Sequence, residues 1–112
     1  MSNSTQVTTG PHGKTCIAAT TKILGDKWTP ILLFALAEQS RRFCDLQSEA
    51  GGVNPRTLSA RLDSLEQTGI VKREVFPEVP PRVEYSLTAK GQDLLPVLQG
   101  MINWADKHEV NC

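Results

Sequence analysis

The chain has 112 residues, the length of one domain, and 39% of them are hydrophobic, which is enough for a small core that dimerisation would help to stabilise. Its 12 basic and 12 acidic residues cancel, so net charge gives no support for a nucleic-acid partner, and only a local basic cluster could. The longest apolar run, residues 31–37, is too short to cross a bilayer and the N-terminus lacks the apolar core of a signal peptide, so we predict a cytoplasmic protein without a membrane partner.

The start of the chain has the composition of an unstructured segment. Residues 1–13 are rich in Ser, Thr, Asn and Gly and show no apolar period, so we expect a disordered arm before one domain over residues 14–112. Three cysteines at wide spacings (Cys16, Cys44 and Cys112) do not suggest a disulfide framework or a zinc ribbon. His12 and His108 are too few and too scattered for a metal site, and we expect neither a metal nor a cofactor.

Two helices are predicted next. Apolar spacing indicates a first helix over residues 16–24 that ends at Gly25. Asp26 can cap a second helix that runs through Ala37, with Pro30 in its first turn, where a missing N–H costs little. The inner face expected for this second helix is broad and comprises Trp28, Ile31, Leu32, Ala35 and Leu36.

A pair of helices joined by a glycine-containing turn follows. A very short strand at residues 41–43 precedes a helix over residues 44–50, and the stretch "GGVN" then predicts a tight turn. Asn54 is a good N-cap and Pro55 is favoured at the first position of the next helix, which Gly69 closes. Leu58, Leu62 and Leu65 form one buried stripe on that helix.

The rhythm then changes to that of strands. Residues 70–75 and 83–87 are rich in Val, Ile and Tyr and predict two antiparallel strands joined by the stiff, proline-rich stretch "FPEVPPR". Thr88 can cap a final helix over residues 89–107. The apolar residues of that helix cover more than one face, which is more than one small domain can bury alone.

This order of elements predicts a winged helix-turn-helix, a mainly α fold with a small β-hairpin, acting as a homodimer. In this architecture the second helix of the pair enters the major groove of DNA, and the hairpin loop touches the backbone or the minor groove. Arg56 suits a bidentate contact with guanine, Thr57 or Ser59 suits a base edge or a phosphate, and Arg61 suits a phosphate. The full set of predicted DNA-binding residues is Asn54, Pro55, Arg56, Thr57, Ser59, Ala60, Arg61, Arg41, Lys72, Arg73, Pro80 and Arg82.

Several collinear motifs resemble the HxlR-type family of bacterial winged-helix transcription regulators. They are "LGDKWTPILLFAL", "RRFCDL", "VNPRTLSARLDSLEQTGIV", "PPRVEYSLTAKG" and the late Trp104. The resemblance implies a dimeric regulator whose first and last helices form the dimer interface, that often represses a nearby gene, and that in several members senses electrophiles or oxidants through a cysteine. Cys16 is followed by Ile17, where the family usually has proline. The expected interface residues are Ile17, Leu94, Leu95, Leu98, Met101, Ile102 and Trp104.

Cys16 and Arg82 each have two competing interpretations, and Cys44 has one. Cys16 is either a sensing thiol at the start of a helix or a small hydrophobe packed near the dimer helices. Cys44 beside Phe43 is expected in the core. Arg82 is either a DNA contact, since arginine suits a narrow minor groove, or a partner for Glu84.

The predicted function is therefore a DNA-binding transcriptional regulator, acting as a repressor on a pseudo-palindromic operator and responding to an oxidant, an electrophile or another small molecule. The alternative is a winged-helix protein-interaction module that does not bind DNA, which the neutral net charge favours. No paired carboxylates, nucleophile–base pair or cofactor motif indicates an enzyme.

Overall fold

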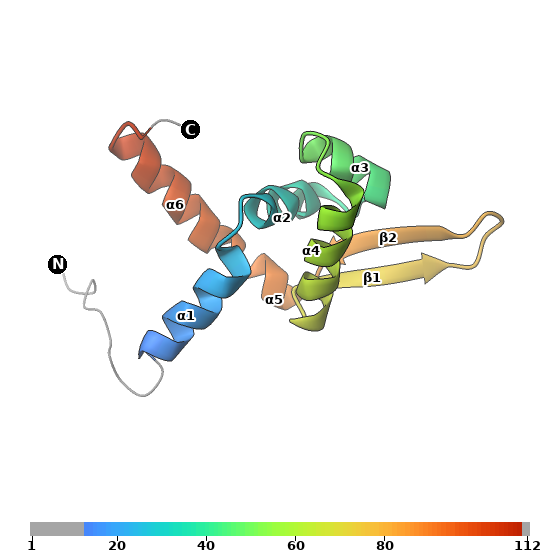
Figure 1. Cartoon of the computed structure of the whole chain (residues 1–112), viewed down its shortest axis with the longest axis horizontal. Coiled ribbons are helices and arrows are strands. Elements are labelled where there is room, and N and C mark those ends of the chain that lie inside the picture. Colours follow the sequence, from blue (N-terminus) through green and yellow to red (C-terminus); the bar gives the residue numbers. More distant parts are fainter. Residues whose placement is uncertain (1–12, 111–112) are drawn as a thin grey trace.

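The computed structural model describes residues 13–110, with side chains from Ile17 onward. The elements in chain order are α1 (Gly13–Leu24), α2 (Trp28–Glu38), α3 (Phe43–Glu49), α4 (Pro55–Gln67), β1 (Val71–Phe76), β2 (Arg82–Leu87), α5 (Ala89–Gln92) and α6 (Leu95–Lys107). Figure 1 shows α2, α3, α4 and the hairpin as one body, from which α1 and α6 project on the side away from the hairpin tip. The predicted fold class, a winged helix-turn-helix with mainly α structure, is confirmed.

The N-terminal boundary differs slightly from the predicted one. Helix α1 begins at Gly13, which the sequence places in the arm, and the remainder of that arm lies outside the described residues, as does His12. None of the helices in the described part of the chain combines the length and the apolar character needed to cross a membrane.

The hydrophobic core lies where α2, α4 and the base of the hairpin meet. The predicted stripe on α4 is confirmed, because Leu58, Leu62 and Leu65 are all buried. Helix α2 departs from prediction at two positions: Leu33, not assigned to the inner face, is fully buried, whereas Ile31 is 40% exposed. Most residues of α2 are apolar, so periodicity alone could not identify its inner face.

Asp26 caps the first turn of α2, as predicted, and the helix itself begins at Trp28. Its Oδ1 accepts hydrogen bonds from the backbone N–H groups of Trp28 and Thr29, both at 2.8 Å, and its Oδ2 accepts one from the Thr29 hydroxyl at 2.6 Å. Partial burial by itself would raise the pKa of Asp26, but these hydrogen bonds and the nearby Arg61 outweigh it and hold the pKa below its ordinary value of 3.8.

Asp26→Ala is expected to lower the free energy of unfolding by about 0.5–2 kcal/mol, since it removes the N-cap. Asp26→Asn keeps an acceptor for the cap and is the matched control. Because the pKa of Asp26 is lower in the folded state, its contribution is present above pH 3.8 and is lost as pH falls through the folded-state pKa. Urea denaturation at pH 7 and at pH 3 measures both effects, and an Asp26→Ala variant as stable as wild type at pH 7 would contradict the assignment.

The turn between α3 and α4 needs glycine. Gly51 and Gly52 have φ angles of 76° and 81°, in the left-handed region that other residues rarely adopt. Asn54 then caps α4, its Oδ1 accepting from the N–H groups of Arg56 at 2.8 Å and Thr57 at 3.4 Å. Pro55 occupies the first turn, as predicted, so this turn sets the direction in which α4 leaves the body.

The hairpin is longer than predicted. β1 and β2 pair in antiparallel register from Val71 opposite Leu87 to Phe76 opposite Arg82, which leaves residues 77–81 as the connection. The predicted short strand at residues 41–43 is a single bridge, in which Arg41 and Tyr85 exchange two backbone hydrogen bonds of 2.9 and 2.8 Å.

The predicted last helix is broken in two. Thr88 caps α5 as expected, with its hydroxyl accepting from the Gly91 N–H at 3.1 Å, but the chain turns at residues 93–94 before α6 begins. Pro96 explains the break, because it has no N–H for the carbonyl of Gln92 and its ring would clash with that carbonyl in a continuous helix.

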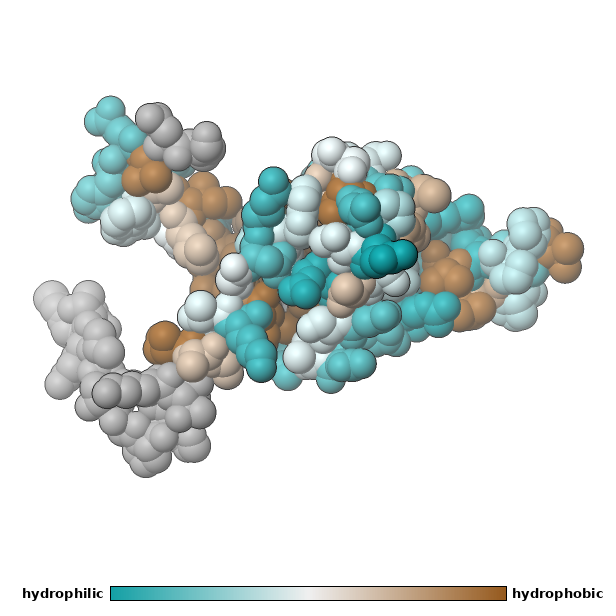
Figure 2. All heavy atoms as spheres, in the orientation of Figure 1, coloured by the Kyte–Doolittle hydropathy of each residue, from teal (hydrophilic) through white to brown (hydrophobic). Residues whose placement is uncertain are grey.

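The projecting helices expose apolar side chains, which Figure 2 shows along α6 and on α1. Among the predicted interface residues, Ile17, Met101, Ile102 and Trp104 are 66%, 55%, 42% and 60% exposed. Leu94 and Leu95 are half-buried, and Leu98 packs in the core of its own chain. Three of the predicted interface residues, Leu94, Leu95 and Leu98, therefore pack toward the core of their own chain at and after the break before α6.

Candidate DNA-binding surface

The side of α4 opposite its leucines is open to solvent and contains small side chains. Arg56, Ser59, Ala60 and Asp63 are exposed, while Thr57 is half-buried. Small residues allow the helix backbone to come close to base edges. Within the described part of the chain, Arg56 forms no ion pair, so its guanidinium is available for a bidentate contact.

Arg41 has a structural role that the sequence did not indicate. Its side chain is only 15% exposed, and it pairs with Glu38 at 2.7 Å and lies 3.9 Å from Glu49. Its Nε also donates to the Ala35 carbonyl at 3.1 Å, satisfying an acceptor in the last turn of α2. The geometry assigns the charge of Arg41 to the α2–α3 corner, which differs from the phosphate contact predicted for it.

Arg41→Ala is therefore expected to destabilise the fold by about 1–3 kcal/mol, because it leaves a partly buried carbonyl without its donor. Thermal unfolding measures this loss. Arg42→Ala, at the neighbouring exposed arginine, is the matched control and should change stability little. An Arg41→Ala protein with unchanged stability but weaker DNA binding would show that the predicted phosphate contact is correct.

Arg61 lies at the edge of the α4 surface and pairs with Asp26. The distance from its Nη1 to Asp26 Oδ2 is 3.5 Å, and the arginine side chain is 38% exposed. This ion pair joins α4 to the corner between α1 and α2. Arg61 is thus a candidate phosphate contact, and it also connects α4 to the segment between α1 and α2.

Arg82 is held by neighbours within the hairpin. Its guanidinium lies over the Phe76 ring at 4.2 Å, and its Nη1 is 3.0 Å from Glu78 Oε2. Its Nε is 3.1 Å from Glu84 Oε2, although that contact lacks hydrogen-bond geometry. The sequence leads us to expect Arg82 either to contact DNA or to pair with Glu84, and in the structure it lies beside Glu84. A DNA contact would require Arg82 to leave two carboxylates.

The remaining basic residues of the hairpin are more accessible. Lys72 is exposed and pairs loosely with Glu74 at 3.7 Å, and exposed Arg73 forms no ion pair within the described residues. Pro80 is exposed at the tip beside Val79. The freely available positive charge of this face therefore lies on α4 and β1.

The cysteines differ from prediction in one respect. Cys44, expected in the core, is exposed near the start of α3, so that prediction is wrong. Cys16 is the fourth residue of α1, in its first turn, but its side chain lies outside the described ones. Cys112 also lies outside the described residues.

A capped helix that projects small and basic side chains beside a β-hairpin defines the class of winged-helix DNA-binding transcriptional regulators. Residues 23–111 match the model of the HxlR-like helix-turn-helix family, and the chain belongs to that family.

The chain is similar to known regulators over most of its length. It is 43% identical over 93 residues to the uncharacterized HTH-type transcriptional regulator BH0655 of Halalkalibacterium halodurans, covering 82% of each chain. The reduced form of the redox regulator HypR superposes with a TM-score of 0.78 at 35% identity, covering 85% of this chain and 94% of that one. Reduced YodB from B. subtilis gives a TM-score of 0.75 at 33% identity, covering 89% of this chain and 94% of YodB. Diamide-treated YodB gives a TM-score of 0.71 at 34% identity, covering 87% of this chain and 92% of YodB.

Proposed function

We propose that a homodimer of this chain binds a pseudo-palindromic operator and represses transcription from it. Two α4 helices would enter successive major grooves about one helical turn apart. The observation that carries the proposal is the exposed side of α4, where Arg56, which forms no ion pair within the described residues, lies beside Ser59 and Ala60. The apolar side chains exposed on α1 and α6 support pairing of two copies.

Selection of bound duplexes from a random pool tests this function. We expect enrichment of two related half-sites, and an affinity that falls linearly with log[salt] at a slope of about −0.9 per phosphate neutralised. A protein-interaction module would enrich no duplex. If the enriched sites contain only one half-site, the proposed dimer on DNA is incorrect, and the α4 contact can still stand.

We further propose that an oxidant or electrophile releases the repressor by reacting at Cys16. The similarity to HypR and YodB, together with the position of Cys16 in the first turn of α1, supports this response. Free backbone N–H groups and the helix dipole at that position favour the reactive thiolate. Because α1 is one of the projecting helices, a modification there would change how two copies fit together.

Diamide is expected to dissociate the wild-type protein from its operator, whereas Cys16→Ser stays bound. Diamide takes one hydrogen from each of two thiols, here Cys16 and a cysteine of the second copy other than Cys44, so that one disulfide forms and diamide is reduced to the hydrazine; serine has no thiol to contribute. Cys44→Ser is the matched control and should be released like wild type. Operator binding before and after diamide, and after reversal with dithiothreitol, gives the measurement. Equal release of Cys16→Ser and wild type would place sensing at another cysteine.

A further inference from the structure

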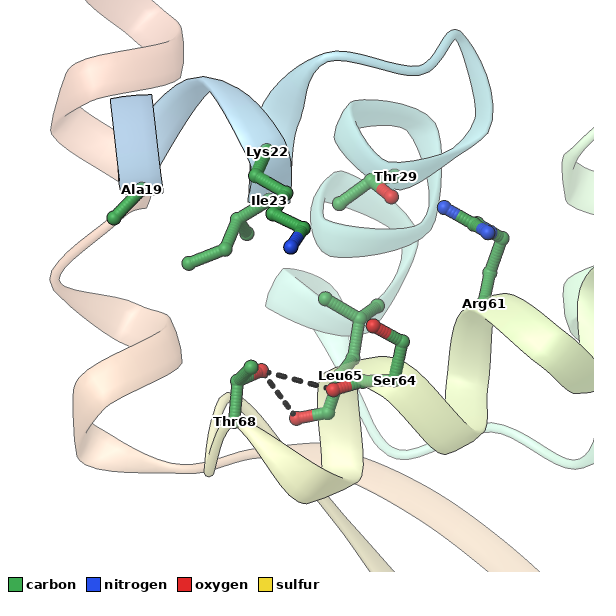
Figure 3. Close-up of a pocket in the computed structure, with 8 residues that line it drawn as sticks. All are labelled: Ala19, Lys22, Ile23, Thr29, Arg61, Ser64, Leu65 and Thr68. Atoms are coloured by element: carbon green, nitrogen blue, oxygen red, sulfur yellow. Dashed lines mark hydrogen bonds between the residues drawn. The ribbon is translucent and has the colours of Figure 1, made fainter. Parts of the chain in front are cut away.

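A pocket of about 310 Å³ lies between α1, the start of α2 and α4 (Figure 3). Its size falls at the lower end of the range for small-molecule sites. Ile23 of α1 and Leu65 of α4 form apolar walls, and Ala19 lies at one side. The DNA-binding surface described above uses none of these three residues.

The polar groups of the pocket are cations and hydroxyls. In Figure 3 the Lys22 ammonium and the Ser64 hydroxyl point into the space between α1 and α4, and the Arg61 guanidinium closes the end beside Thr29. Within the described part of the chain, Lys22 forms no ion pair and the Ser64 hydroxyl forms no hydrogen bond. Among the residues that the structure describes, no carboxylate lines the pocket.

The neighbouring acidic group is already engaged. Asp26 accepts hydrogen bonds from the backbone of Trp28 and Thr29 and from the Thr29 hydroxyl, so its charge is largely satisfied by the start of α2. Its contact with Arg61 is its longest, at 3.5 Å. The pocket therefore has two positive groups whose charges are incompletely neutralised, next to apolar walls.

We propose that this pocket binds a small organic anion, a carboxylate attached to an apolar body, as a noncovalent effector. The carboxylate accepts from Lys22, Arg61 and the Ser64 hydroxyl, as charge-assisted hydrogen bonding favours. The apolar body packs against Ile23 and Leu65. An ion without such a body would leave those walls unused.

The position of the pocket gives the ligand a route to the recognition helix, a step that rests on the proposed function. The ion pair between Arg61 and Asp26 joins α4 to the α1–α2 corner. A bound carboxylate competes with Asp26 for Arg61 and so weakens this connection. The ligand body also separates α1, which projects toward the expected partner copy, from α4. Binding of the ligand thus changes the angle between α1 and α4, and with it the relative orientation of the two α4 helices that contact the half-sites.

Titration of the full-length protein with benzoate, followed by amide NMR shifts without DNA, tests the site. We expect saturable shifts at Ala19 and Ser64, and weaker binding by benzamide, which lacks the charge, and by inorganic phosphate, which lacks the apolar body. Lys22→Gln should raise the benzoate Kd about tenfold, the loss of one charge-assisted hydrogen bond. Lys107→Gln, at the far end of α6, is the matched control and should bind like wild type.

Two results would overturn the site: benzamide or phosphate binding as tightly as benzoate, or an unchanged Kd in Lys22→Gln. A separate measurement addresses regulation. Saturating benzoate should change the operator affinity of wild type severalfold and that of Lys22→Gln less at the same concentration. If ligand-free protein fails to bind any operator, the proposed function fails while the pocket assignment stands. If benzoate binds but operator affinity does not move, the effector role is overturned.

Discussion

Ile102→Asp is expected to leave the protein monomeric and to lower operator affinity about 100-fold or more. Ile102 is 42% exposed on α6, near Met101 at 55% and Trp104 at 60%. A carboxylate placed in an apolar interface must lose its hydration without gaining a partner, which strongly opposes association. A monomer then binds one half-site at a time and loses the 10²–10⁴-fold gain of two linked contacts.

Asn103→Asp is the matched control, because it places the same carboxylate on the adjacent position of α6. Asn103 is exposed, and its Oδ1 accepts from Gln99 Nε2 at 3.0 Å, an interaction that aspartate can retain. Light scattering measures the mass of each protein, and anisotropy with operator DNA measures affinity. A dimeric Ile102→Asp protein would show that another surface joins the two copies.

The elements that the sequence predicted best depend on local chemistry. Asn54 followed by Pro55 determines where α4 begins through interactions within one turn, and the leucine spacing determines which side is buried. The strong apolar content of residues 89–107 predicts one continuous last helix. Pro96 overrides that content, since one missing N–H and one steric clash interrupt the helix at the preceding turn.

The candidate site was predictable in its residue types and less so in their partners. Asp26 and Arg61 lie far apart in the chain, and only folding brings them to 3.5 Å. Arg41 donates to the Ala35 carbonyl, a backbone acceptor that no charge pattern reveals. The alternation of Arg82 and Glu84 on one face of a strand was a visible signal, but the stacking of Arg82 on Phe76 depended on the register of the hairpin.

These partners separate the arginines of the predicted surface into different groups. Arg56 and Arg73 are exposed and form no ion pair within the described residues. Arg41, Arg61 and Arg82 each contact at least one carboxylate. An arginine that must first leave a carboxylate gains less from a phosphate or a base, because the lost ion pair offsets the new contact.

Arg56→Ala is accordingly expected to weaken specific operator binding by about 1–3 kcal/mol and to relax the preference at one base pair in each half-site, as loss of a bidentate contact with guanine predicts. Arg82→Ala is the comparison within the hairpin and should weaken binding less and more evenly across sequences, because Glu78 and Glu84 already occupy its guanidinium. Gel shifts on operators varied at each position distinguish the two patterns.

If Arg82→Ala reduces affinity as much as Arg56→Ala, then Arg82 leaves its carboxylates when DNA binds, and the hairpin reads the minor groove through Arg82. If neither substitution changes affinity, α4 does not dock in the major groove by its N-terminal half.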